Sequence, residues 1–220
     1  MKHDPQPQIS EWLGVDLSSE QRALLEGFER WLSDEAIPAG LLSPGERDRI
    51  WARHIVDSLS FSVAWTGDAP QRLIDAGSGG GLPGIPLAIA FPQTAVTLLD
   101  RSSKSVRLLR RAIRVLGLAN TEAIVGDVRE QRRCEAVTMR AVLRPPEAVE
   151  VMRDVLMPGG RGVIGLAHRR TADPGWRQLG GRVVKVSVLD PTGWLLIMQQ
   201  RGHRQTHLDR SDHQPEGRSG

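Results

Sequence analysis

The sequence lacks both a pair of cysteines and any apolar run of membrane-spanning length. The 220 residues include one cysteine, Cys134, which cannot form an internal disulfide and is expected to be a small apolar core residue. A chain without disulfides fits the reducing cytosol. No apolar run reaches the ~20 positions of a transmembrane helix, and residues 1–5 show no signal-peptide core. We therefore expect a cytoplasmic protein that does not enter a membrane, and the histidine and cysteine spacing predicts no metal site.

The sequence also contains very few lysines. Only Lys2, Lys104 and Lys185 are lysines, so arginine supplies nearly all of the 29 basic residues, and the net charge is +3. The planar fork of arginine suits bidentate contacts to phosphate and to guanine edges, which favours a nucleic-acid partner. A genome whose base composition favours arginine codons explains the same bias, so the bias by itself decides nothing.

Residues 1–65 are predicted to form a helical cap. Ser18 and Gln21 have the spacing of a capping box and open a helix that runs to about Leu32, after an irregular lead-in. A second helix is predicted over residues 46–64. Because 220 residues are short for two domains, we expect this cap to belong to the same single domain as the rest of the chain.

Residues 66–202 alternate strands with helices, which predicts a mostly parallel, doubly wound sheet. Strands are expected at residues 72–76, 94–99, 122–125, 136–139 and 162–167, and helices at residues 85–90, 103–116 and 146–156, the last ended by Gly159-Gly160. Two further strands, 184–188 and 194–198, flank the turn Asp190-Pro191-Thr192-Gly193 and close the sheet as a hairpin. The predicted fold class is α/β, a seven-stranded mixed sheet with helices on both faces.

Residues 203–220 are almost free of apolar side chains and are predicted to be a disordered tail. The tail contains His203, His207 and His213. Metal binding is one interpretation of these histidines, but a solvated tail explains them better.

A glycine-rich turn follows the first predicted strand and precedes a helix: Asp75-Ala76-Gly77-Ser78-Gly79-Gly80-Gly81-Leu82-Pro83-Gly84. That order places it at the carboxyl edge of the sheet, where open α/β folds bind ligands and where glycine lets the backbone approach closely. The dinucleotide pattern G-x-G-x-x-G requires glycine at position 82, where Leu82 stands. Because no pyrophosphate need fit, the turn suits S-adenosylmethionine, an amino acid joined to a nucleoside, better than NAD.

Two carboxylates extend this predicted cofactor site. Asp100 ends the next strand, 25 residues after Asp75, where a carboxylate can accept hydrogen bonds from both ribose hydroxyls. Asp127 follows the third strand, where a polar side chain can meet an adenine amino group. Together with Gly77, Gly79 and Gly81, these aspartates predict a nucleoside cofactor site.

The glycine turn and its extension resemble the RsmG (GidB) family, which methylates N7 of a guanine in 16S ribosomal RNA. The resemblance is carried by residues 73–89, with the extension Leu-Pro-Gly-Ile-Pro-Leu, and by residues 53–59, 98–104 and 137–141. It implies the Rossmann-like fold of class I methyltransferases, S-adenosylmethionine as the cofactor, and 16S ribosomal RNA or a small-subunit precursor as the partner of a monomer. It also implies cofactor contacts from Gly77, Leu82, Val128, Arg129 and Arg140.

Some positions depart from the family pattern, and several of the lost groups are basic or polar. Ser105 stands where the family has arginine, and Asp127 stands near another family arginine. These departures leave two alternatives open: a methyltransferase of this fold acting on a small molecule or a protein, and a non-catalytic RNA-binding paralogue.

A basic stripe is predicted on the helix over residues 103–116. Arg107, Arg110, Arg111 and Arg114 recur at helical spacing, and Lys104 and Arg101 extend the stripe. The stripe can follow a phosphate backbone, and a plain solvated helix face is the alternative.

Three more polar residues are candidates for the substrate side. Arg140 closes the fourth strand and is a candidate for positioning a ligand, by clamping the cofactor carboxylate or an RNA phosphate; the alternative is an ion pair with a nearby acid. His54 and Asp57 lie three residues apart on one helix, as an acid–base pair or in a core hydrogen bond. Attack by guanine N7 requires no general base, because N7 already carries a free lone pair, so we assign none.

Overall fold

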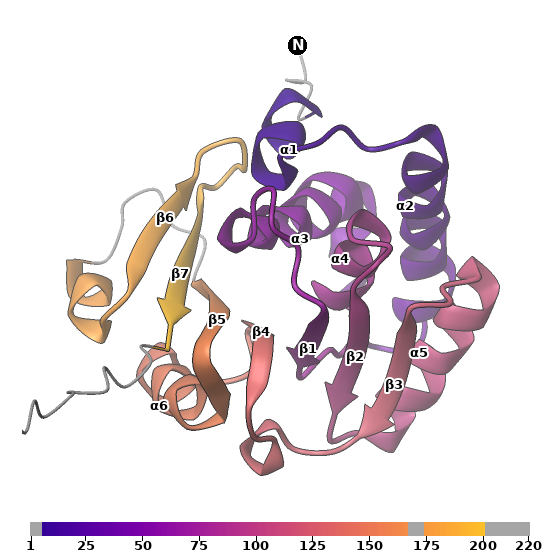
Figure 1. Cartoon of the computed structure of the whole chain (residues 1–220). Coiled ribbons are helices and arrows are strands. Elements are labelled where there is room, and N and C mark those ends of the chain that lie inside the picture. The colour runs from indigo at the N-terminus through magenta and orange to yellow at the C-terminus, as the bar shows by residue number, and fades with distance from the viewer. Residues whose placement is uncertain (1–5, 167–173, 201–220) are drawn as a thin grey trace, which may run out of the picture.

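The computed structural model describes residues 6–166 and 174–200, which form one seven-stranded sheet flanked by helices (Figure 1). The predicted tail and its three histidines lie outside the described residues. The strands are β1 (Arg72–Ala76), β2 (Ala95–Asp100), β3 (Thr121–Val125), β4 (Cys134–Arg140), β5 (Leu156–Leu166), β6 (Arg182–Val186) and β7 (Gly193–Gln199). Their order across the sheet is β3-β2-β1-β4-β5-β7-β6. The first five strands pair in parallel, whereas β7 runs antiparallel to both β5 and β6. The predicted mixed sheet with its closing hairpin is therefore confirmed.

Helices cover both faces of the sheet. The helices are α1 (Gln6–Leu13), α2 (Ser19–Trp31), α3 (Val56–Ser60), α4 (Gly84–Ala90), α5 (Ser103–Leu116) and α6 (Pro145–Val155). Shorter 3-10 or π turns are η1 (Leu32–Ala36), η2 (Pro44–Arg49), η3 (Trp51–Ile55), η4 (Phe61–Ala64), η5 (Val128–Glu130) and η6 (Pro174–Leu179). Leu73 packs with residues of α1 to α5, whereas its neighbour Ile74 packs with residues of α6, because successive side chains of a strand point to opposite faces. The N-terminal helices share one buried cluster with the sheet.

The predicted irregular lead-in is wrong, because residues 6–13 form the helix α1. Ile9, Trp12 and Leu13 lie on one face of α1 and are buried, and α1 packs against α3 and η4. The capping box that begins α2 is confirmed: Gln21 N–H donates to Ser18 Oγ at 3.1 Å, and Ser18 N–H donates to Gln21 Oε1 at 2.8 Å. A helix of two turns is stable here through tertiary packing rather than through propensity.

The second predicted helix is helical but not regular. The chain over residues 44–64 passes from 3-10 to π to α and back to 3-10 geometry. Ser60 Oγ donates to Asp57 O at 2.6 Å, and Ser62 Oγ donates to Leu59 O at 2.7 Å. Serine side chains that bond the carbonyl three residues earlier compete with the α-helical ladder, which accounts for the tightening at the end of this segment.

The predicted boundary between α6 and β5 is also wrong. The helix ends at Val155, Leu156 is already extended, and Leu156 pairs with Cys134 of β4. Gly159-Gly160 therefore lies inside β5, and a Cβ at Gly160 would stand 2.8 Å from the carbonyl oxygen of Cys134. Cys134 itself is buried, and burial raises the pKa of its thiol, as expected for an apolar core residue. Every helix of the described residues is too short or too polar to cross a membrane.

Candidate active site

Two adjacent cavities lie at the carboxyl edge of the sheet. The strand order reverses between β1 and β4, and open α/β sheets bind ligands at such a switch point. The chain leaving β1 forms the glycine turn, and the chain leaving β4 forms residues 141–143. A cavity of about 190 Å³ and another of about 370 Å³ both have Ala141 and Leu143 in their walls. Residues 141–143 therefore form the partition between them.

The smaller cavity, here called the glycine-turn cavity, is lined by residues that follow β1, β2, β3 and β4. Its walls are Gly77, Asp100, Arg101, Gly126, Asp127, Val128, Arg129, Ala141, Val142 and Leu143. Five predicted cofactor residues meet there, namely Gly77, Asp100, Asp127, Val128 and Arg129. Gly81 and Leu82 are buried beneath the turn and do not line this cavity, and Arg140 lines the larger one.

The three glycines of the motif serve different physical needs. A Cβ at Gly77 would overlap the Val142 side chain, and a Cβ at Gly81 would stand 2.6 Å from Ile85 Cδ1. Both positions are thus glycine because the protein packs tightly there. Gly79 has φ +53°, and a Cβ on it would meet only Gly77 O at 3.9 Å. Gly79 is therefore the glycine of the three that faces open space, where a ligand can approach the backbone.

Buried Asp75 ties the glycine turn to the helix that follows it. Its Oδ2 accepts the Gly84 N–H at 3.0 Å and its Oδ1 accepts the Thr138 hydroxyl at 2.9 Å. Burial raises the pKa of Asp75 to about 6, against the opposing effect of these hydrogen bonds. The first amide of α4 is thereby used inside the protein, so it is not free to bind a pyrophosphate.

Asp100 and Asp127 give the glycine-turn cavity two carboxylates. Asp100 Oδ2 accepts the Gly79 N–H and Oδ1 accepts the Ser102 N–H, both at 2.8 Å. A carboxylate has about four lone-pair sites, so Asp100 retains capacity for two ribose hydroxyls. Asp127 Oδ1 accepts the Arg129 N–H at 2.9 Å, which starts η5.

These residues fit S-adenosylmethionine better than a dinucleotide. Gly79 leaves room above the turn, and Asp100 offers acceptors of the kind that ribose hydroxyls require. The Gly84 N–H is already bonded to Asp75, so the first amide of α4 is not available to a pyrophosphate. The geometry therefore agrees with the cofactor choice made from Leu82.

The larger cavity, here called the Arg140 cavity, brings the cap against the ends of β4, β5 and β7. It is lined by Arg53, His54, Asp57, Arg140, Ala141, Leu143, Pro145, Gly165, Leu166 and Trp194. Its volume of about 370 Å³ is within the usual range of ligand pockets, about 300–1,000 Å³. Apolar side chains and a tryptophan share its wall with polar groups, a combination that suits a heterocyclic base.

Arg140 is held in this cavity by two residues of the cap. Its Nη1 donates to Asp57 Oδ2 at 3.2 Å, and its Nη2 donates to His54 Nδ1 at 3.1 Å. His54 Nε2 lies 3.2 Å from Glu46 Oε2. Because a guanidinium can only donate, Nδ1 of His54 is the acceptor, so Nε2 carries the proton and donates a hydrogen bond to Glu46. His54 and Asp57 thus both act on Arg140 rather than as an acid–base pair.

The imidazole of His54 is neutral near pH 7. Burial and, after it, the adjacent charge of Arg140 lower its pKa to about 4, whereas Glu46 and Asp57 oppose the shift. A neutral imidazole can accept the Arg140 hydrogen bond, and an imidazolium cannot. The network Glu46–His54–Arg140–Asp57 therefore orients one guanidinium toward the cavity.

Three residues of the predicted basic stripe on α5 make surface contacts with other parts of the chain. Lys104 Nζ donates to Ala39 O at 2.8 Å, Arg110 Nε donates to Ala123 O at 2.9 Å, and Arg111 pairs with Glu35. Lys104 and Arg111 thus connect α5 to the cap, whereas Arg110 contacts β3. All five side chains of the stripe on α5, with Arg107 and Arg114 among them, are exposed. An RNA-binding role for the stripe stays a prediction.

The sequence alone did not single out Arg53, Ala141, Val142 or Trp194. Trp194 lies near the start of β7 and next to Trp176, with ring centroids 6.2 Å apart. Because an apolar side chain in a strand is expected in the core, the sequence did not mark it as a site residue. Ala141 has φ +56°, a conformation that side chains rarely adopt and that often marks functional sites. No sequence signal marks that position, because alanine carries no such preference.

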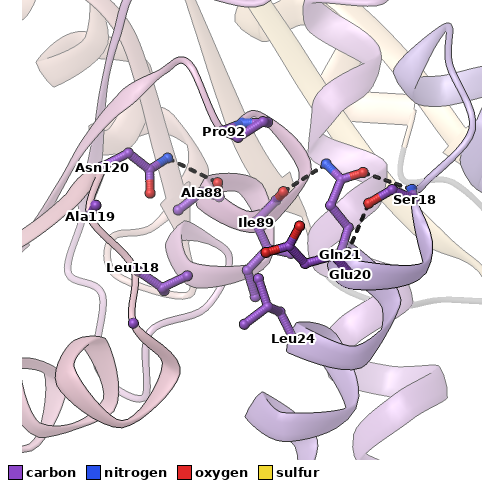
Figure 2. Close-up of a pocket in the computed structure, with 11 residues that line it drawn as sticks. Ser18, Glu20, Gln21, Leu24, Ala88, Ile89, Pro92, Leu118, Ala119 and Asn120 are labelled. Carbon is purple, nitrogen blue, oxygen red and sulfur yellow. Dashed lines mark hydrogen bonds between the residues drawn. The ribbon is translucent and has the colours of Figure 1, made fainter.

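A third cavity, of about 520 Å³, lies at the opposite, amino edge of the sheet (Figure 2). Its polar side chains cap the end of α4: Gln21 Nε2 donates to Ile89 O at 2.9 Å, and Asn120 Nδ2 donates to Ala88 O at 3.0 Å. These groups hold the fold together, so cavity size does not identify the active site here. The described residues also place no three metal-ligating side chains together.

The fold and site define the class of the protein. A seven-stranded sheet with an antiparallel β7 and a carboxylate-lined cavity at the β1/β4 switch point is that of a class I S-adenosylmethionine-dependent methyltransferase. A crystal structure of a methyltransferase from Geobacter sulfurreducens has the same fold, with a TM-score of 0.56 and 19% identity over 89% of this chain and 96% of that chain.

The sequence comparisons then give the family. The family model of rRNA small subunit methyltransferase G matches residues 21–170. Ribosomal RNA small subunit methyltransferase G of Laribacter hongkongensis is 36% identical over 67% of this chain and 72% of its own length. The protein of the same name from Acidothermus cellulolyticus is 38% identical over 62% of this chain and 61% of its own length. The chain belongs to the rRNA small subunit methyltransferase G family, and its cofactor is S-adenosylmethionine.

Proposed function

We propose that the chain transfers a methyl group from S-adenosylmethionine to N7 of a guanine in the RNA of the small ribosomal subunit. The observation that carries this proposal is the pair of cavities that share the partition at residues 141–143. One cavity offers the acceptors that a nucleoside cofactor needs, and the other offers an apolar and aromatic wall for the acceptor base. Family membership supports the same substrate class, since the relatives are ribosomal RNA small subunit methyltransferases.

The chain's own residues act by alignment and by their charges. When bound, S-adenosylmethionine supplies an electrophilic methyl group on a sulfonium. The N7 lone pair of guanine takes this methyl in line, and the electron pair of the broken carbon–sulfur bond remains on sulfur. No proton leaves N7, so the site requires no general base, in agreement with His54, whose acceptor nitrogen is already bonded to Arg140. Asp100 and Gly79 hold the cofactor side, and Arg140 orients the acceptor side.

A base within a folded RNA must leave its stack to enter the Arg140 cavity. Leu143, Pro145, Leu166 and Trp194 line that cavity, and flat heterocycles bind well against such side chains. The cap contributes Arg53, His54 and Asp57 to the same cavity, so it forms part of the acceptor site as well as of the fold. We further propose that the chain works as a monomer in the cytoplasm.

A labelled methyl group tests the proposal. Purified chain is incubated with methyl-labelled S-adenosylmethionine and either intact small subunits or their protein-free RNA, and the RNA is then digested to nucleosides. We expect the label in 7-methylguanosine. Label that enters a small molecule or protein instead would favour the alternative acceptors. Cofactor binding with no transfer to RNA would overturn the proposal.

A further inference from the structure

The two guanidinium groups of the Arg140 cavity are not equivalent. Arg140 pairs with Asp57 at 3.2 Å, and both side chains are largely buried, with 20% and 7% exposed. Arg53 lines the same cavity and has no ion pair within residues 6–166 and 174–200. Asp57 is thus matched to Arg140, and the charge of Arg53 lacks a carboxylate in the part of the chain that the structure describes.

The Nε of Arg53 is closed off from solvent and has no hydrogen-bond partner among the described residues. A buried donor left unsatisfied costs stability, and the cost is greater when the group is charged, so such groups are rare and call for an explanation. Two other atoms share this condition, Trp31 Nε1 and Ser58 Oγ, and neither lines the Arg140 cavity. The Nε–H of Arg53 is therefore the unsatisfied hydrogen-bond donor that belongs to the Arg140 cavity.

We propose that Arg53 binds a phosphate of the nucleotide whose base is methylated. This inference rests on the proposed function. A guanidinium has five donors in a planar fork that matches phosphate oxygens, and a phosphate bound at the edge of that fork would supply the missing counter-charge. The cavity then holds both parts of a nucleotide, the base against Leu143, Leu166 and Trp194 and the phosphate at Arg53.

The cofactor carboxylate is the other anion of this reaction. We expect it beside the glycine turn. Arg53 does not line the glycine-turn cavity, and residues 141–143 separate that cavity from the Arg140 cavity. The charge of the product gives a second reason to favour phosphate. Methylation at N7 leaves a positive charge on the guanine ring, and a phosphate on Arg53 shields that ring from a second, unpaired cation.

The test compares Arg53→Gln with a matched control, Arg49→Gln, which removes the same charge from an exposed position just before η3. Arg53→Lys is the conservative variant, and thermal melts establish that each variant is folded. Three quantities are measured on each: the KM and kcat for methylation of protein-free small-subunit RNA, the Kd for that RNA over a range of salt, and the Kd for S-adenosylmethionine without RNA.

We expect Arg53→Gln to raise the KM for RNA by roughly tenfold to hundredfold, the loss that one charged hydrogen-bonded contact represents. The salt dependence of RNA binding should lose about one unit of slope, and the cofactor Kd should not change. Arg53→Lys should recover part of the affinity, and Arg49→Gln should leave the KM within about twofold.

Three outcomes overturn the inference. A loss of cofactor affinity without RNA in Arg53→Gln would assign the guanidinium to the cofactor carboxylate. Unchanged RNA binding and methylation in that variant, with an active parent, would remove Arg53 from the site while leaving the proposed function intact. A parent chain that binds the cofactor but never methylates RNA would overturn the proposed function and this inference with it.

Discussion

Alanine at Gly79 is predicted to damage cofactor binding far more than it damages the fold. Gly79 has φ +53° and its added Cβ would meet only Gly77 O at 3.9 Å, so alanine fits sterically in the protein alone. The left-handed backbone costs an L residue about 1–2 kcal/mol. In a domain of this size each 1 kcal/mol lowers Tm by about 2–4 °C, so the variant should melt about 2–8 °C below the parent.

Gly117 is the matched control for this change. It also has a left-handed backbone, with φ +66°, and a Cβ on it meets nothing within 4 Å. It ends α5 at the amino edge of the sheet and lines the cavity of Figure 2, away from the glycine turn. Gly117→Ala should therefore lower Tm by a similar amount and leave cofactor binding unchanged.

Calorimetric titration with S-adenosylmethionine separates the two variants. Gly79→Ala should lose at least about tenfold in affinity, or about 1.4 kcal/mol, because its Cβ takes room that the cofactor needs beside the Asp100 hydrogen bond. Valine at the same position should abolish binding, since a branched side chain adds both bulk and backbone strain. Equal cofactor affinities in Gly79→Ala and Gly117→Ala would refute this account of the turn.

The remaining predictions concern the carboxylates and the Arg140 network. Calorimetry should show binding of S-adenosylmethionine and none of NAD; the reverse would contradict the assignment of the turn. Asp100→Ala should weaken cofactor binding by about 1–3 kcal/mol, through lost hydrogen bonds to ribose, and an unchanged Kd would misplace the site. Arg140→Lys keeps a charge for Asp57 but loses the planar guanidinium that also reaches His54. The kcat should therefore fall and the KM for RNA should rise, while the cofactor Kd without RNA stays constant. A comparable rise in that Kd would assign Arg140 to the cofactor. Because burial raises the pKa of Asp75 from 3.8 to about 6, this carboxyl group ionises at a lower pH in the unfolded chain than in the folded protein. The free energy of unfolding therefore falls by up to about 3 kcal/mol as the pH rises through that range. Asp75→Asn should remove that loss, so urea titrations at pH 4 and pH 8 should favour the variant at the higher pH, and a parallel pH dependence would show that Asp75 is not titrating there.

The elements that sequence patterns predict well are those that depend on local order. The β1 strand, the glycine turn and α4 follow one another within a few residues, and buried parallel strands are apolar in a recognisable way. The place of Gly77, Asp100 and Asp127 in one cavity followed from the rule that parallel strands end at a common edge.

The features that escaped prediction depend on contacts between distant segments. Asp57 and Arg140 are 83 residues apart in sequence, and no local pattern joins them. A Cβ at Gly77 would overlap Val142, a constraint that only the packing of the two turns shows. The helix α1 is short and depends on packing against α3, so its apolar residues alone did not distinguish it from a loop.

The central claim is tested most directly by mapping 7-methylguanines in small-subunit ribosomal RNA from cells with and without this chain. The account predicts that one guanine loses its N7 methyl when the gene is deleted, that the parent chain restores it, and that Gly79→Val does not. Identical methylation maps in the two strains, with the chain present and folded in the first, would contradict it.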